Sequence, residues 1–285
     1  MTQPVLTLII GLPLAGLSLN GLTAELSGAP TVVEKHNPTI QVASTGGQVR
    51  PFLQAGEPCS DRPDAAIATF EDANLEAATR TALSVGAQDD LTCRLVAGLA
   101  ELDAPGRTIE SLAGIQNFTI LAGLDLQDNS IVNIGALVGL TNLTRLSLAS
   151  NSITNISPLS GLTSLTVLDL HDNSITDISA LTELTSLIAL VLDNNPGLSD
   201  MGPLSGLTSL TFLWLNDNSI TDIQPLLDNT GLGEGDTVDL GSTNVTCTDV
   251  AALQAKRVVV ISDCPARIRV VRGRLPGSYR SPAPR

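Results

Sequence analysis

Residues 165–178 read LTVLDLHDNSITDI, and this pattern, LxxLxLxxNxIxxI, occurs five times between Leu121 and Ile223, with one extra residue and other apolar residues for the isoleucines in the copy at 187–201. The asparagines of successive copies are 22, 22, 22 and 23 residues apart, at Asn129, Asn151, Asn173, Asn195 and Asn218. A fixed period of about 20 to 50 residues is the sequence signature of a repeat array such as a solenoid. The extra residue of the last interval falls in the turn at residues 195–197.

The spacing inside one copy predicts the path of each coil. The step of two between Leu168 and Leu170 fits a short strand with both leucines facing inward, and the later steps of three fit a return path with 3₁₀ turns. A coil of 22 residues has no room for a full helix beside its strand and two turns. The copies therefore predict an α/β solenoid with a short parallel sheet on its concave face and an irregular, 3₁₀-containing convex side. We count seven strands, from residues 99–104 to residues 238–240.

The repeated asparagine has a predicted structural role. The backbone bends away from the strand at this position, which leaves inward-pointing N–H and C=O groups in need of partners. An amide side chain offers both a donor and an acceptor. The five asparagines are therefore expected to form an internal ladder rather than a binding site.

The copies, joined by segments such as LSGLTSL at residues 159–165, resemble bacterial internalin-type leucine-rich repeats of 22 residues. The similarity continues upstream into residues 70–83, which resemble the helical cap of that class, and residues 109–115, which resemble its first half-repeat. Downstream, residues 229–240 resemble its closing segment. This resemblance implies a recognition scaffold with a concave binding sheet, and it implies no particular partner.

These observations divide the chain into six predicted parts. They are a signal peptide at 1–29, a linker at 30–64, a helical N-terminal cap at 65–98, leucine-rich repeats at 99–245, a C-terminal cap at 246–265 and a basic disordered tail at 266–285. In the N-terminal cap, the alanine-rich run predicts a helix from Ala65 to Ser84. A second helix is expected after Asp89 and Asp90, one of which would cap it.

The N-terminus has the features of a secretory signal. An apolar stretch from Val5 to Leu19 is interrupted by Pro13 and precedes a small-residue site at Ala29. The segment before it carries no Lys or Arg, unlike most signals. The alternative is a disordered or mis-started N-terminus.

Four cysteines lie in pairs at the two ends of the repeats. Cys59 and Cys93 flank the helical cap, and Cys247 and Cys264 flank the closing segment. Two terminal disulfides in an oxidising compartment are therefore predicted, with free buried thiols as the alternative. No pair has CxxC spacing, so no zinc site is expected.

Charge is divided unevenly along the chain, whose net charge is −14. Residues 98–246 hold 17 acidic and two basic residues, whereas the last twenty residues hold six arginines and no acid. Nucleic acid is an unsuitable partner for the repeats, because a phosphate backbone requires a basic face. The sequence also lacks a nucleophile elbow, a phosphate-binding glycine loop and a metal-ligand cluster, so we predict no enzyme activity, cofactor or metal.

Residues beside the inward leucines of each strand must face the concave side. The candidate binding residues on this side are Trp214, Phe212, Val191, His171, Asp169, Arg145, Asp125, Asp193 and Asn216. Arg145 is expected to offset its neighbours Asp125 and Asp169. Phe212 and Trp214 would project together as the centre of binding; the alternative is that both rings pack against the closing segment.

The sequence therefore predicts an exported recognition module that binds a protein or peptide through the concave sheet. The expected partner is basic or polar with an apolar anchor. The protein is expected to be monomeric, secreted or at the cell surface, and without a membrane span after signal cleavage. The alternatives are an intracellular leucine-rich-repeat regulatory subunit and a structural spacer of a surface protein.

Overall fold

The computed structural model describes residues 17–19, 22–24, 42–45, 48–59 and 65–264. The predicted cleavage site at Ala29 and the predicted tail at 266–285 lie outside the described residues. Ahead of the repeats, β1 (Leu17–Leu19) pairs antiparallel with β2 (Leu22–Ala24), and β3 (Val42–Thr45) pairs antiparallel with β4 (Gln48–Pro51). No helix in the described part of the chain is long and apolar enough to cross a membrane.

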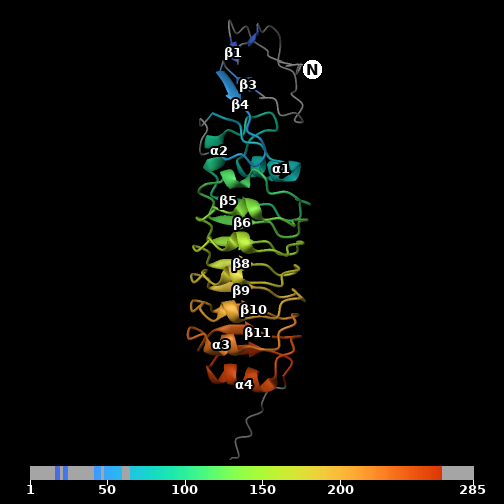
Figure 1. Ribbon diagram of the computed structural model, residues 1–285, viewed down its shortest axis with the longest axis vertical. Coiled ribbons are helices and arrows are strands. Elements are labelled where there is room, and N and C mark those ends of the chain that lie inside the picture. The colour runs from blue at the N-terminus through green and yellow to red at the C-terminus, as the bar shows by residue number, and fades with distance from the viewer. Residues whose placement is uncertain (1–16, 20–21, 25–41, 46–47, 60–64, 265–285) are drawn as a thin grey trace, which may run out of the picture.

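Eight short strands form one parallel sheet in sequence order, stacked along the long axis of the molecule (Figure 1). They are β5 (Glu101–Asp103), β6 (Gly123–Asp125), β7 (Arg145–Ser147), β8 (Val167–Asp169), β9 (Ala189–Val191), β10 (Phe212–Trp214), β11 (Thr237–Asp239) and β12 (Val259–Ile261). This arrangement confirms the predicted leucine-rich-repeat solenoid. The count of seven strands was wrong, because the closing segment adds β12 in register beside β11.

The wall opposite the sheet is built from single 3₁₀ turns and one short helix. These are η2 (Ile115–Asn117), η3 (Gly135–Leu137), η4 (Ser157–Leu159), η5 (Ser179–Leu181), η6 (Gly202–Leu204) and α3 (Gln224–Asp228). Each coil buries its inward leucines and isoleucines almost completely, as at Leu168, Leu170 and Ile175. The core is therefore a continuous aliphatic column that fixes which side chains are left to face solvent.

The asparagine ladder joins each coil to the one before it. The Nδ2 group of Asn173 donates to the carbonyl oxygens of Leu170 and His171 in its own coil and of Leu148 in the preceding coil, at 3.0–3.1 Å. Its Oδ1 accepts from the N–H of Ile153 at 2.9 Å. One amide thus bonds to four backbone groups in the buried interior, where unpaired N–H and C=O groups are costly.

The fifth asparagine of the ladder, Asn218, bonds to a different backbone N–H from the other four, because the preceding coil has one extra residue. Asn218 accepts from the N–H of Asn195 itself, whereas the earlier copies accept from a residue two positions further on, such as Ile175. Pro196 has no N–H to offer, and the N–H of Leu198 turns back to the carbonyl of Asn195 at 2.8 Å. The structure thus places the extra residue in the turn at 195–197.

The N-terminal cap departs from the predicted helices. Helix α1 runs only from Ala73 to Ala82, because residues 66–68 are extended, with Ala68 donating to Leu91 and Ile67 accepting from Leu53. Asp72 caps α1 and also accepts from the N–H of Glu110 at 2.8 Å. Burial, the largest single influence, raises the pKa of Asp72, but four backbone N–H groups together outweigh it and lower the pKa.

The second cap helix, α2 (Cys93–Ala97), begins later than expected. Its N-cap is Thr92 and not Asp89 or Asp90, because the Asp89 carboxylate instead accepts from the N–H of Gly86 at 2.6 Å. The cap meets the first coil where the Phe70 and Phe118 rings lie 5.9 Å apart. A Cβ at Gly114, which has φ of +115°, would lie 2.5 Å from the Phe70 ring, so glycine is required there.

The far end closes with α4 (Cys247–Ala255), followed by β12. Lys256 donates to the carbonyls of Leu226, Leu227 and Asn229, which satisfies the C-terminal end of α3. Disulfides close both ends of the solenoid: Cys59 bonds to Cys93, and Cys247 bonds to Cys264. The described residues include no free cysteine.

Candidate functional site

The solvent-facing side of strands β5 to β12, called here the sheet face, is the side predicted to be concave. Strand register lines up its side chains in two columns. The first column is Glu101, Gly123, Arg145, Val167, Ala189, Phe212, Thr237 and Val259. The second is Asp103, Asp125, Ser147, Asp169, Val191, Trp214, Asp239 and Ile261. Both columns change from charged to apolar between β7 and β10.

Phe212 and Trp214 lie together on β10. Phe212 is 47% exposed and Trp214 is 38% exposed, and their ring centroids lie 6.5 Å apart at a tilt of 37°. The closing segment therefore leaves both rings open to solvent. With Val167, Ala189 and Val191 on the two preceding strands they form what we call the apolar patch. Sequence reasoning missed Val259 and Ile261, exposed beyond β11, because their strand has no leucine pattern.

His171 marks the edge of the apolar patch. Its Nδ1 lies 2.8 Å from Oδ1 of Asp169, a second-column residue that lies two positions earlier in the chain. Burial, the largest single influence, lowers the pKa of His171. The hydrogen bond to Asp169 and the charges of Asp169, Asp193 and Asp172 outweigh it, so the pKa is raised above its usual 6.5.

Asp193 lies one coil beyond His171 and is half-buried. Burial raises the pKa of Asp193, and the nearby charges of Asp169 and Asp217 raise it further, while His171 lowers it. We call Asp169, Asp172, Asp193 and Asp217 the acidic border. No Lys or Arg of the described residues forms a salt bridge with any of these four carboxylates.

Some of these acids have a structural reason to be where they are. The residue before each of the five ladder asparagines has positive φ, 51° to 56°, at Asp128, Ser150, Asp172, Asn194 and Asp217. Asp and Asn tolerate this left-handed conformation better than most residues. Asp169 also accepts from the N–H of His171 two residues on. Asp193 has no positive φ and accepts no hydrogen bond from the N–H two residues on. Of the four border acids, it is therefore the one whose presence is least explained by the local backbone geometry.

The N-terminal half of the sheet face forms a shallow acidic hollow of about 620 Å³. Its charged lining residues are Glu101, Asp103, Asp125, Arg145 and Asp169. Arg145 does not form its salt bridge with Asp125 or Asp169, as expected, but with Glu101 two strands away, at 2.9 Å. Gly123 permits this contact, because a Cβ there would lie 1.7 Å from the Glu101 carboxylate. Ser147 Oγ, also in the lining, is buried without a hydrogen-bond partner.

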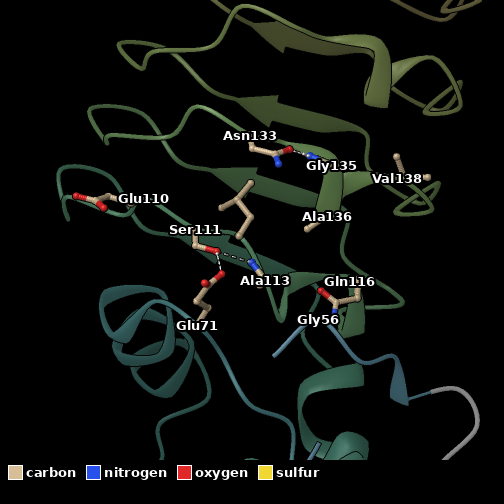
Figure 2. A pocket seen from close by; sticks show the side chains of 11 residues that line it. Gly56, Glu71, Glu110, Ser111, Ala113, Gln116, Asn133, Gly135, Ala136 and Val138 are labelled. Atoms are coloured by element: carbon tan, nitrogen blue, oxygen red, sulfur yellow. Dashed lines mark hydrogen bonds between the residues drawn. The ribbon is translucent and has the colours of Figure 1, made fainter. Parts of the chain in front are cut away.

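A second hollow, of about 490 Å³, lies on the opposite side near the N-terminal cap (Figure 2). Its polar side chains mostly bind one another: Ser111 donates to Glu71 at 2.6 Å and accepts from the N–H of Ala113. Asn133 likewise accepts from the N–H of Gly135. No sequence signal marked this hollow, since it depends on residues near Gly56 packing against the first coils. These internal bonds indicate a structural joint.

The predicted binding residues occupy these surfaces as follows. Phe212, Trp214 and Val191 lie in the apolar patch, with His171, Asp169 and Asp193 at its border, and Arg145 and Asp125 lie in the acidic hollow. Asn216 is half-buried beside Trp214's strand, and its Nδ2 donates to Asp217 at 2.8 Å. Among the residues that the structure describes, no group of three or more His, Cys, Asp or Glu side chains could hold a metal ion.

Comparison with known proteins agrees with this architecture. A family model for leucine-rich repeats in two copies matches residues 121–161, 141–183, 163–206 and 185–229. The solved structure of an internalin, InlF, from Listeria monocytogenes is 32% identical, with a TM-score of 0.63, over 68% of this chain and 56% of that chain. Internalin C2 of the same organism is 33% identical, with a TM-score of 0.53, over 68% of this chain and 94% of that chain. This chain thus spans little more than half of InlF. No curated protein sequence matches it.

Proposed function

Because the chain belongs to the internalin-type leucine-rich repeat proteins, a family of protein-interaction modules, we propose that its sheet face binds a protein or peptide. The apolar patch is the centre of this site, and the acidic border surrounds it. The partner carries basic or polar groups around an apolar anchor. The protein acts by recognition and not by catalysis.

The observation that carries the proposal is the exposure of Phe212 and Trp214 on β10. In the coils before them, the same columns hold small, aliphatic or charged residues, so no framework requirement selects aromatic rings there. Large rings that pack against each other and stay open to solvent on a rigid strand are typical of interface hot spots. Burial of these rings by a partner would supply most of the apolar area of the contact.

The acidic border supports a cationic partner. Asp172, Asp193 and Asp217 have no Lys or Arg partner among the described residues, and they lie beside a ring surface that would exclude water once it is covered. Exposed acids also steer a cationic partner from a distance of about 10 Å at 0.1 M salt. Association is therefore expected to slow as salt rises.

Export is the second part of the proposal. Cys59–Cys93 and Cys247–Cys264 bonds persist in oxidising compartments, which supports a secreted or cell-surface location over an intracellular regulatory subunit. N-terminal sequencing of the protein from its native source should find cleavage after Ala29. An uncleaved Met1 terminus with reduced cysteines would favour the intracellular alternative.

The binding proposal is tested by selecting linear peptides from a random library on the immobilised full chain. Selected peptides should combine Arg or Lys with an apolar residue. Trp214→Ala should weaken their binding by about 2 kcal/mol, roughly 30-fold in Kd, while leaving the melting temperature nearly unchanged.

Val132→Ala is the matched control, since Val132 is 59% exposed and lies outside the sheet. It should leave the Kd unchanged. Peptides that bind Trp214→Ala as tightly as the parent, or a library that yields no binder, would favour the structural-spacer alternative. A Trp214→Ala variant that unfolds would identify the ring as structural.

A further inference from the structure

The strongest positive charge of this chain lies in the segment that follows the sheet face. The last twenty residues contain six arginines and no acid, and residues 267–275 read RIRVVRGRL, with arginines and apolar residues interleaved. This is the composition that the proposed site would recognise, namely guanidinium groups for carboxylates and aliphatic side chains for the ring surface.

The acceptor surface has charges that the described residues do not neutralise. The salt bridges that Arg80, Arg145 and Arg257 form are with Glu76, Glu101 and Glu234. Among the residues that the structure describes, His171 is thus the only titratable cation in contact with the acidic border, and it contacts Asp169. An arginine beside Asp193 would offset the negative charges of Asp169 and Asp217, which act on its carboxylate.

The described part of the chain ends next to β12, at the C-terminal edge of the sheet. Cys264 is tied to Cys247, and the chain before it forms β12, the edge strand. From β12 to β9 there are three strand spacings, about 14 Å at 4.8 Å each. The 11 residues from 265 to 275 can span up to about 36 Å when extended. A segment of this length is therefore long enough to reach the apolar patch, and the exposed Val259 and Ile261 lie on β12 between the two.

We propose that residues 267–275 bind in cis across the sheet face, with their arginines at Asp193 and Asp217 and an aliphatic side chain on the Phe212 and Trp214 rings. The proposal rests on the proposed function of this face. Because the segment is covalently attached, its local concentration is in the millimolar range, and a weak contact is enough to occupy the site. A partner must then displace the segment, which lowers its apparent affinity.

Trp214 is the only tryptophan of the chain, so its fluorescence in the full chain reports directly on this contact. Quenching by acrylamide, which is uncharged, is measured for the parent and for a variant with Arg267→Gln, Arg269→Gln, Arg272→Gln and Arg274→Gln. The quenching constant should rise about twofold in the variant, as expected for a site that is covered half the time or more in the parent. About 1 M salt, where the Debye length is about 3 Å, should produce the same rise in the parent.

Two controls make the result specific. Arg280→Gln with Arg285→Gln removes tail charge outside the proposed segment and should leave quenching unchanged, as should Glu183→Gln, which removes an exposed acid remote from the sheet face. Asp193→Asn with Asp217→Asn should reproduce the effect of the arginine variant. Thermal unfolding should be the same for all of these proteins.

Equal quenching in the parent and the four-arginine variant would overturn the proposal. If the protection of Trp214 from acrylamide disappeared on dilution of the protein, the proposal would be overturned as well. The segment on the sheet face would then belong to a second copy of the chain. The selected peptides separate the two proposals. If peptides bind in a Trp214-dependent way but quenching is the same in the parent and the four-arginine variant, only the cis contact is rejected. If Trp214 is protected from quenching but the library yields no peptide binder, only the external partner is rejected.

Discussion

Strands β5 to β7 and strands β9 to β12 present different chemistry on one continuous sheet. In the first group the outward residues are mainly acidic, with Arg145 held by Glu101, and they surround a hollow. In the second group they are mainly aliphatic and aromatic, with the acids at the border. The inward residue at the centre of each strand is leucine in β5 to β10 and valine in β11 and β12. The framework therefore leaves the outward positions free to vary, and specificity is determined there.

The largest predicted effect concerns the disulfides at the two ends of the solenoid, which test whether the acidic and apolar halves of the sheet are supported independently. Cys59–Cys93 and Cys247–Cys264 are separated by 34 and 17 residues. In the chain-entropy model their removal should destabilise the protein by about 4 and about 3 kcal/mol. Cys59→Ser with Cys93→Ser should loosen the end near β5, and Cys247→Ser with Cys264→Ser the end near β12, as measured by urea unfolding and by hydrogen exchange at each strand.

Thiol titration of the unfolded, unreduced parent should find no free cysteine. If removing either bridge raised exchange equally in both halves, the repeats would unfold as one unit. The acidic and apolar halves could then not be treated as independently supported surfaces.

The ladder tests whether the two halves share one framework. Asn151→Ala, in the acidic half, and Asn173→Ala, at the start of the apolar half, each leave one backbone N–H without its partner. Each also removes one of the two hydrogen bonds that three carbonyl oxygens accept. Each should lower the free energy of unfolding by about 3 kcal/mol, measured by chemical denaturation. Asn142→Ala removes a single exposed hydrogen bond to Thr119 and should have an effect well below 1 kcal/mol.

If Asn151→Ala and Asn173→Ala lowered the free energy of unfolding by different amounts, the acidic and apolar halves would not share a common framework. A loss much smaller than about 3 kcal/mol at both sites would mean that water replaces the amide, which the burial of Asn173 at 6% exposed argues against.

The period of the leucines predicted both sheet-face columns, because a step of two on a strand allows only one assignment of faces. What could not be predicted depended on contacts remote in sequence. Glu101 reaches Arg145 only because Gly123 between them has no side chain. Helix α1 starts at Ala73, and not at Ala65, because residues 66–68 hydrogen-bond to the segments at Leu53 and Leu91. Strand β12 was missed because its register is set by β11 and not by an LxxLxL pattern.

The smallest predicted effect concerns His171, at the junction of the acidic and apolar halves. Asp169→Asn removes the nearest negative charge and leaves at most a neutral hydrogen bond to the imidazole, so the raised pKa of His171 should fall. Asp125→Asn is the matched control, because Asp125 lies in the same column two strands away and makes no contact with the ring. NMR titration of the imidazole protons of His171 measures both variants.

The direction of the pH effect follows from the raised pKa. Protonated His171 contributes stability that is fully present below its unfolded pKa of about 6.5, and this contribution disappears as pH rises through the higher folded value. Over the same interval the site loses a positive charge, so the acidic border becomes a stronger attractor for cations. Stability should therefore fall slightly while affinity for an arginine-containing peptide rises, and in Asp169→Asn both changes should occur at lower pH. If the two quantities changed in the same direction, or if Asp125→Asn altered them equally, the imidazole would not be the group that couples the two halves of the sheet face.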